Sequence, residues 1–153
     1  NVPTRIQKAE TEGLDAIVLA RAGVDRLGLE EHITEVLDTD LLLPAPGQGA
    51  LGVQCREDDS ATLALLAAID HAATRAAVTA ERTFLQALGG GCSAPIGAFA
   101  RTGDDDTIDL LGIVGAVDGS RLIRVQGQAC APDSLGRSLA EDARRQGALE
   151  LLS

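Results

Sequence analysis

One cysteine lies in a loop that carries almost no side chains. Cys92 follows three consecutive glycines, at 89–91, and precedes the stretch Ser-Ala-Pro-Ile-Gly at 93–97. Consecutive glycines give the backbone access to positive φ and leave room beside the sulfur for a bulky group. A buried structural cysteine does not need such a loop, whereas the loop suits a cysteine that carries a covalent group. The first hypothesis is therefore a reactive or modified thiol, and a small buried hydrophobe is its alternative.

Other cysteine and glycine chemistries fit the sequence less well. No Lys-Ser or Lys-Thr follows the glycines and no strand leads into them, so this is not a phosphate-binding loop. The three cysteines, at 55, 92 and 130, form no Cys-x-x-Cys pair, which argues against dithiol redox chemistry. They do not resemble a disulfide framework either, and we expect a reducing cytoplasm. Cys55 alternates with Val53 and is expected in a core, and Cys130 is assigned no role.

The positions of three arginines make them candidates for binding carboxylates. Arg5 is near an expected helix start, Arg26 is in a short helix, and Arg56 ends an expected strand. Each alone is expected to be a surface charge. If the three converge, they form a pocket for carboxylates, because guanidinium binds carboxylate through two hydrogen bonds.

Metal and nucleic-acid sites are not expected. The two histidines are isolated, and the run Asp104–Asp106 falls between two expected strands, where Asp favours a solvated turn. The chain has 13 basic and 23 acidic residues, a net charge of −10, which argues against a generic nucleic-acid surface. No apolar run approaches the roughly 20 residues that span a bilayer. The chain begins without Met, and we expect it to be part of a larger protein.

The first part of the chain has an α/β pattern. A helix is expected from near Pro3 to Gly13, capped by Asn1, followed by a buried strand at 14–20 and short helices at 21–27 and 30–37. Two prolines and two glycines then exclude helix and central strand at 44–49, which predicts a linker or a functional loop. A strand at 50–56 and a helix capped near Asp59, running to about Ile69, follow.

The second part predicts a small α+β unit. A helix after about residue 74 carries apolar residues on one face and ends at Gly89. Three strands are expected at 96–101, 107–117 and 121–128, with Asp118-Gly119 predicting a type I′ hairpin turn. A last helix from Pro132 to Gly147 has its apolar residues at i, i+4 spacing, namely Leu135, Leu139 and Ala143.

Four ordered segments resemble one family. They are Asn-Val-Pro-Thr-Arg at 1–5, Leu-Pro-Ala-Pro-Gly-Gln-Gly-Ala-Leu-Gly at 43–52 with Cys55-Arg56, Thr-Ala-Glu-Arg at 79–82, and Gly-Gly-Cys-Ser-Ala-Pro-Ile-Gly at 90–97. Together they resemble porphobilinogen deaminase, also called hydroxymethylbilane synthase, along the whole chain. Pro46 and the pair at 93–94 depart from the family pattern, and neither departure removes a reactive group.

The resemblance implies a three-domain architecture. Its first two domains resemble the two lobes of a periplasmic binding protein, and the third is a small α+β domain. Residues 1–43 would end the second domain, 44–49 would be a hinge and 50–67 a return into the first domain. Residues 68–71 would be a second hinge, and 72–153 the third domain.

The resemblance also implies a transferase activity and a cofactor. The family joins four porphobilinogen molecules into hydroxymethylbilane, with release of ammonia, in haem biosynthesis. A dipyrromethane cofactor would be attached to Cys92 by a thioether. Arg5, Arg56, Gln48 and Gly49 would contact the cofactor, and Arg26 and Arg5 the carboxylates of the substrate. The family's catalytic aspartate would lie in an N-terminal half outside this chain, so this chain alone should be inactive. The whole enzyme should be a cytoplasmic monomer without nucleic-acid or membrane partners.

Two other functions remain open. A ligand-binding module of the periplasmic-binding-protein type would explain the α/β start and the arginines, but it leaves Cys92 without a purpose. A thiol-dependent acyl transferase would need a histidine near Cys92, and only His32 and His71 are available.

Overall fold

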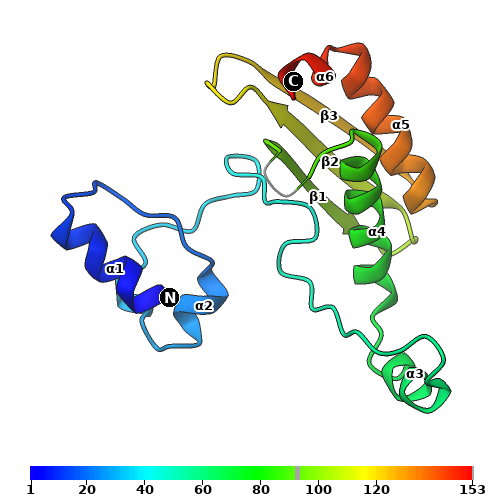
Figure 1. Cartoon of the computed structure of the whole chain (residues 1–153), viewed down its shortest axis with the longest axis horizontal. Coiled ribbons are helices and arrows are strands. Elements are labelled where there is room, and N and C mark those ends of the chain that lie inside the picture. The colour runs from blue at the N-terminus through cyan, green and yellow to red at the C-terminus, as the bar shows by residue number, and fades with distance from the viewer. Residues whose placement is uncertain (92–93, 153) are drawn as a thin grey trace. The chain divides into compact units, whose positions relative to one another are not determined.

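The chain folds into two compact units. The computed structural model describes residues 1–91 and 94–152. The first unit is Asn1–Leu41 and the second is Leu42–Ser153. The second unit contains the sheet and most of the buried residues, so it holds the larger core (Figure 1).

The first unit is built from short helices. Helix α1 (Val2–Thr11) begins as predicted, with the Asn1 side chain accepting a hydrogen bond from the Thr4 amide at 3.5 Å. Helix α2 (Arg21–Asp25) also forms where it was expected. Only one 3₁₀ turn, η1 (Glu30–His32), forms in the segment 30–37, so the longer helix predicted there is wrong. Val24 is the one buried hydrophobic residue of this unit.

Two predicted strands do not form. Among the described residues, neither 14–20 nor 50–56 pairs with another strand. Val18 and Val53 are each 63% exposed, and Cys55 is only half-buried, so the core position expected for Cys55 is wrong. A strand is stable only when a neighbouring strand satisfies its backbone N–H and C=O groups and another layer covers its apolar side chains. An apolar run in the sequence supplies neither.

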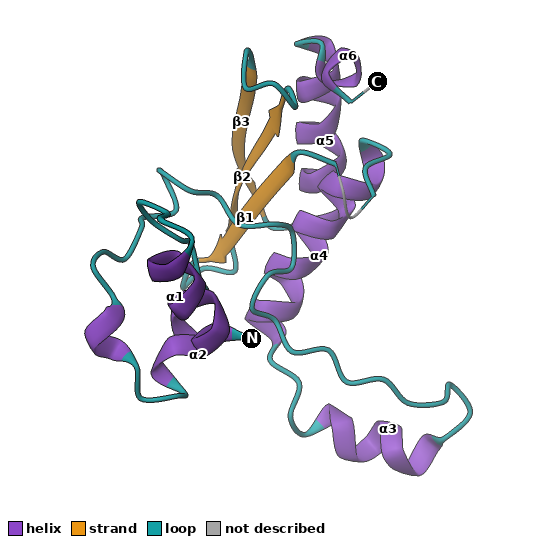
Figure 2. Ribbon diagram, turned by 60° about the vertical axis from the view of Figure 1, so that its left-hand side comes forward, coloured by secondary structure: helices purple, strands orange, loops and turns teal. Residues whose placement is uncertain are grey.

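The second unit has the predicted three-stranded antiparallel sheet with helices. Its strands are β1 (Ile96–Thr102), β2 (Ile108–Gly115) and β3 (Leu122–Ala129), in the order β1-β2-β3. The long helices α4 (Ala72–Ala87) and α5 (Pro132–Arg145) lie on one face of the sheet (Figure 2), and the short helix α6 (Ala148–Leu151) follows.

The core lies between this sheet and its two helices. Alternate residues of β2 are buried, and Leu110 and Val114 have no exposed surface. Phe84 of α4 is also fully buried, and its ring occupies the space that a side chain at Gly112 would fill, since a Cβ there would lie 2.6 Å from the ring. Burying each such side chain contributes about 1.5–3 kcal/mol. This packing joins α4 firmly to the sheet.

The two tight turns of the sheet differ in how well they were predicted. Asp104–Asp106 forms a turn as expected, closed by the Gly103 amide donating to the Thr107 carbonyl at 2.8 Å. The type I′ prediction at Asp118-Gly119 is wrong, because only Gly119 has a positive φ, of 73°. Its amide donates to the Ala116 carbonyl at 3.0 Å, so the loop is longer than a two-residue hairpin.

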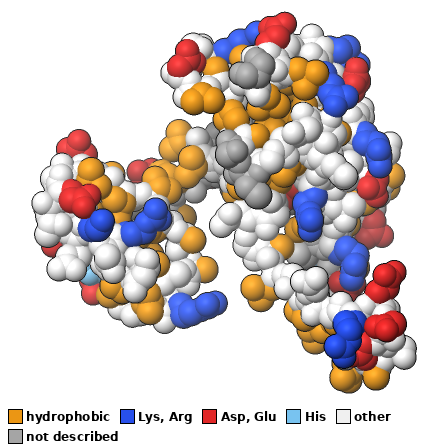
Figure 3. Space-filling view, viewed as in Figure 1, with side chains coloured by type: hydrophobic (Ala, Val, Ile, Leu, Met, Phe, Trp, Pro, Cys, Tyr) orange, Lys and Arg blue, Asp and Glu red, His pale blue; other side chains and the backbone are white. Residues whose placement is uncertain are grey.

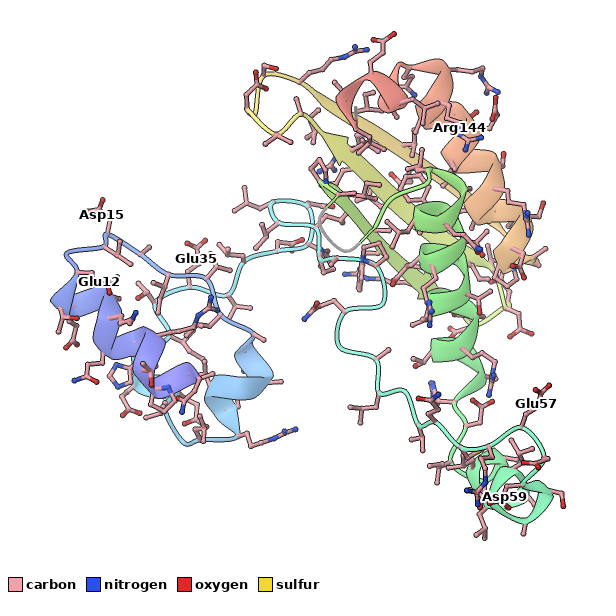
Figure 4. The ribbon with its side chains drawn as sticks, viewed as in Figure 1. Glu12, Asp15, Glu35, Glu57, Asp59 and Arg144 are labelled. Carbon is pink, nitrogen blue, oxygen red and sulfur yellow. The ribbon has the colours of Figure 1, made fainter. Side chains whose placement is uncertain are left out.

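Helix α3 (Ser60–Ala67) is well capped but has no buried residue. The Asp59 carboxylate accepts hydrogen bonds from the amide and hydroxyl of Thr62, at 3.0 and 2.7 Å, which lowers the pKa of Asp59. Figure 4 shows Asp59 beside this helix. Leu65 and Ile69 are 73% and 70% exposed. Figure 3 shows the resulting apolar surface at α3.

No single described helix is long and apolar enough to cross a bilayer. Helices α3 and α4 pass by length and composition alone, and only as a pair bent by 105°. Within residues 1–91 and 94–152, no group of three potential metal ligands comes together.

Candidate functional site

Cys92, the predicted cofactor anchor, lies outside the described residues, together with Ser93. The structure describes what stands on either side of Cys92. Helix α4 ends at Ala87, and β1 begins at Ile96. The described residues on both sides of Cys92 are attached to the core. The Gly90 amide donates to the Leu85 carbonyl at 3.2 Å, and the Gly115 amide of β2 donates to the Pro95 carbonyl at 2.9 Å.

The glycine triplet has a different role at each position. Of the three glycines, Gly89 alone uses the access to positive φ, with a φ of 75°. Gly90 is needed for close packing, because a Cβ there would lie 2.5 Å from Ile96 Cδ1 and 2.8 Å from Leu85 Cδ1. A Cβ at Gly91 would meet nothing within 4 Å. The chain therefore leaves the core at Gly90 and has open space at Gly91, the residue before Cys92.

The predicted loop at 44–49, called the hinge loop from here on, is docked on the edge of the sheet. Its Pro44 carbonyl accepts a hydrogen bond from the Ala98 amide of β1 at 3.0 Å, and the same oxygen would lie 3.2 Å from a Cβ at Gly97. Figure 1 shows this loop in cyan beside β1. Gln48 and Gly49, the two predicted contact residues, are exposed to solvent. They are thus free to reach a ligand from a loop whose base is fixed.

A buried carboxylate also holds the hinge loop on strand β1. Glu81 of α4 is 5% exposed, and its two oxygens accept hydrogen bonds from the Gly47 amide at 2.6 Å and the Ala100 amide at 2.7 Å. Burial raises the pKa of Glu81, and the two amide hydrogen bonds oppose that rise. One side chain therefore connects helix α4, strand β1 and the hinge loop.

Glu81 was not predicted as a site residue, although the sequence holds a signal for it. It stands four residues after Ala77 and three before Phe84, on the apolar face of α4. A carboxylate on such a face must find hydrogen-bond partners inside the protein, since burying it without them is costly. A search for charged residues at apolar-face positions would have selected it.

The predicted arginines lie on different units. Arg5 is in α1 and Arg26 directly follows α2, both exposed and both in the first unit. Arg56 is exposed in the second unit, where it lines a shallow hollow with Gln54, Cys55 and Asp59. The convergence of the three arginines therefore remains a prediction.

The described residues on either side of Cys92 are attached to the core, as is the hinge loop. The loop that bears Cys92 and the hinge loop both attach to the corner made by α4 and β1. The C-terminal end of α4 is stabilised by Arg144 of α5 (Figure 4), whose guanidinium donates to the Ala87 carbonyl.

Two family models match this chain, one in each part of it. A family model described as "Porphobilinogen deaminase, dipyromethane cofactor binding domain" matches residues 1–64. A second, "Porphobilinogen deaminase, C-terminal domain", matches residues 75–145. The first match includes the predicted polar contact residues, and the second includes Cys92.

Curated relatives match along the full chain. A protein named porphobilinogen deaminase from Roseiflexus castenholzii is 50% identical over 155 residues, covering 100% of this chain and 50% of its own length. Proteins of the same name from Brevibacillus brevis and Desulforudis audaxviator are 45% and 48% identical over 100% of this chain and 50% of their own lengths. The chain thus spans about half the length of the curated relatives it matches.

Proposed function

Since this chain belongs to the porphobilinogen deaminase family, we propose that it is the half of a hydroxymethylbilane synthase that anchors a dipyrromethane cofactor on Cys92. The observation that carries this proposal is the packing of the two glycines before Cys92. Gly90 is packed against Leu85 and Ile96, whereas a Cβ at Gly91 would meet open space. The open space at Gly91, the residue before Cys92, supports a role in carrying a bulky group.

The chemistry of the thiol suits this role. Porphobilinogen that has lost ammonia is an electrophilic methylene pyrrolenine, and a thiolate is a good nucleophile towards its methylene carbon. The carbon–sulfur bond that forms is the thioether, so Cys92 serves as an anchor once the bond is made. When bound, the dipyrromethane supplies the end to which further pyrroles are added.

The polar residues are proposed to bind the acetate and propionate groups of the pyrroles. Arg5 and Arg56 would bind carboxylates of the cofactor, and Arg26, with Arg5, those of the substrate. Gln48 and Gly49 would contact the pyrroles from the hinge loop. The exposure of all five residues supports these roles, because none is committed to the core.

The rest of the activity is proposed to lie in the other half of the whole protein. That half would supply the aspartate that assists ammonia release. It would also complete two lobes like those of a periplasmic binding protein, with 14–20 and 50–56 pairing as strands in them. The unpaired state of both segments in this chain supports that proposal.

The test is the reaction of the complete protein that contains this chain. Incubation with porphobilinogen should consume it and release one ammonia for each molecule consumed, with a linear tetrapyrrole as product. A binding module would bind porphobilinogen reversibly without releasing ammonia, and an acyl transferase would leave it unchanged. Either of these two outcomes would contradict the proposal.

A further inference from the structure

Two neighbouring amides of β1 point out of the sheet. β1 is an edge strand, and on such a strand alternate N–H groups have no partner in the sheet. The Ala98 amide donates to the Pro44 carbonyl of the hinge loop, and the next outward amide, at Ala100, donates to Glu81. The hinge loop and Glu81 therefore cover this edge together.

Glu81 is suited to this position by its two acceptor oxygens. Oε2 accepts from the Gly47 amide and Oε1 from the Ala100 amide, so each oxygen serves a different segment. Glutamine offers one acceptor oxygen and one NH₂ group, and the NH₂ would face an amide donor. Aspartate is one methylene shorter and could not reach both amides from the same backbone. The geometry therefore requires glutamate.

The Glu81 contact joins two segments that lie next to predicted site residues in the sequence. Gly47 immediately precedes Gln48, and Ala100 lies on the strand that begins four residues after Cys92. The hinge loop, with Gln48 and Gly49, is exposed beyond its contacts at Pro44 and Gly47. Without the Glu81 contact, the hydrogen bond between the Ala98 amide and the Pro44 carbonyl would be the one left among the described residues to hold the loop on the strand.

We propose that Glu81 is a positioning residue, which fixes the hinge loop on strand β1 and thereby sets Gln48 and Gly49 in place to contact the pyrroles. This proposal rests on the proposed function for its consequence in catalysis. Its structural part, the docking of the hinge loop by Glu81, can be tested without any activity.

The experiment compares Glu81→Gln with Thr83→Val in the complete protein. Thr83 is a matched control: it is 8% exposed on the same helix, and its hydroxyl donates to Asp133 of α5 at 3.1 Å, away from the hinge loop. Hydrogen exchange, followed by mass spectrometry of peptides covering 44–50, reports the docking. We expect Glu81→Gln to raise exchange there about tenfold or more, since a hydrogen bond to a charged group is lost, and Thr83→Val to leave it unchanged.

Turnover gives the second measurement. At a temperature where both variants are fully folded, Glu81→Gln should keep its covalent adduct but lower kcat about tenfold, whereas Thr83→Val should stay within about twofold of the parent protein. Unchanged exchange at 44–50, or equal effects of the two variants on kcat, would overturn the proposal. If the parent protein does not consume porphobilinogen, the proposed function fails, and the exchange measurement alone still decides the docking role.

Discussion

Replacing Cys92 by serine is expected to reduce porphobilinogen consumption by the complete protein more than a hundredfold, to about the level of the uncatalysed reaction. A serine hydroxyl is hardly ionised at neutral pH and is a weak nucleophile unless a base activates it, so no anchor for the growing chain would form. Serine has the same shape as cysteine and is slightly smaller, so it introduces no clash and folding should be unaffected. The initial rate of ammonia release is the measurement.

Cys130→Ser is the matched control for this prediction. Cys130 is a free cysteine, exposed just after the end of β3. Its substitution should leave the rate unchanged. A Cys92→Ser protein that retains more than about a tenth of the parent activity would show that the thiol is not required. Equal losses in the two variants would point to a general sensitivity to cysteine replacement.

Gly136 lies inside helix α5. Replacing it by alanine is expected to lower the free energy of unfolding of the second unit by about 3 kcal/mol. A Cβ at Gly136 would lie 2.5 Å from the Ala80 carbonyl oxygen and 2.9 Å from the Phe84 amide nitrogen of α4. These are backbone atoms of a buried helix, so α5 would have to move away from α4. The Thr83–Asp133 hydrogen bond between the same helices would be strained as well.

Helix propensity alone predicts the opposite sign for Gly136→Ala. Alanine is favoured over glycine inside a helix by about 0.5–1 kcal/mol, so an exposed site would be stabilised. The measurement is the urea midpoint, with Arg137→Ala, at the exposed neighbouring position of α5, as control. The control should change stability by less than about 0.5 kcal/mol. A neutral or stabilising Gly136→Ala would contradict the close packing of α4 on α5.

The α+β part of the fold could be predicted because its local signals agree with its packing. The apolar residues of α4, among them Ala80 and Phe84, form the face that becomes the core, and Pro132 starts α5 where predicted. The turn at Asp118-Gly119 was placed correctly but assigned the wrong type. Loop length depends on strand pairing, which begins only at Gly115 and Leu122.

The parts that could not be predicted depend on partners distant in the sequence. The apolar runs at 14–20 and 50–56 have the pattern of strands, but the described residues supply no neighbouring strand for them. Glu81 could be recognised from the sequence as a carboxylate on an apolar helix face, but its partners in the hinge loop and β1 could not. Arg5, Arg26 and Arg56 could be identified as carboxylate-binding residues by type, but their convergence depends on the arrangement of separate units.

Intact mass spectrometry of the freshly purified complete protein tests the covalent role of Cys92 most directly. The parent protein and Cys130→Ser should each exceed the mass calculated from sequence by two linked pyrrole units, and Cys92→Ser should show no such excess. Fully active parent protein with the unmodified mass, or an adduct that persists in Cys92→Ser, would contradict the assignment of Cys92 as the cofactor anchor.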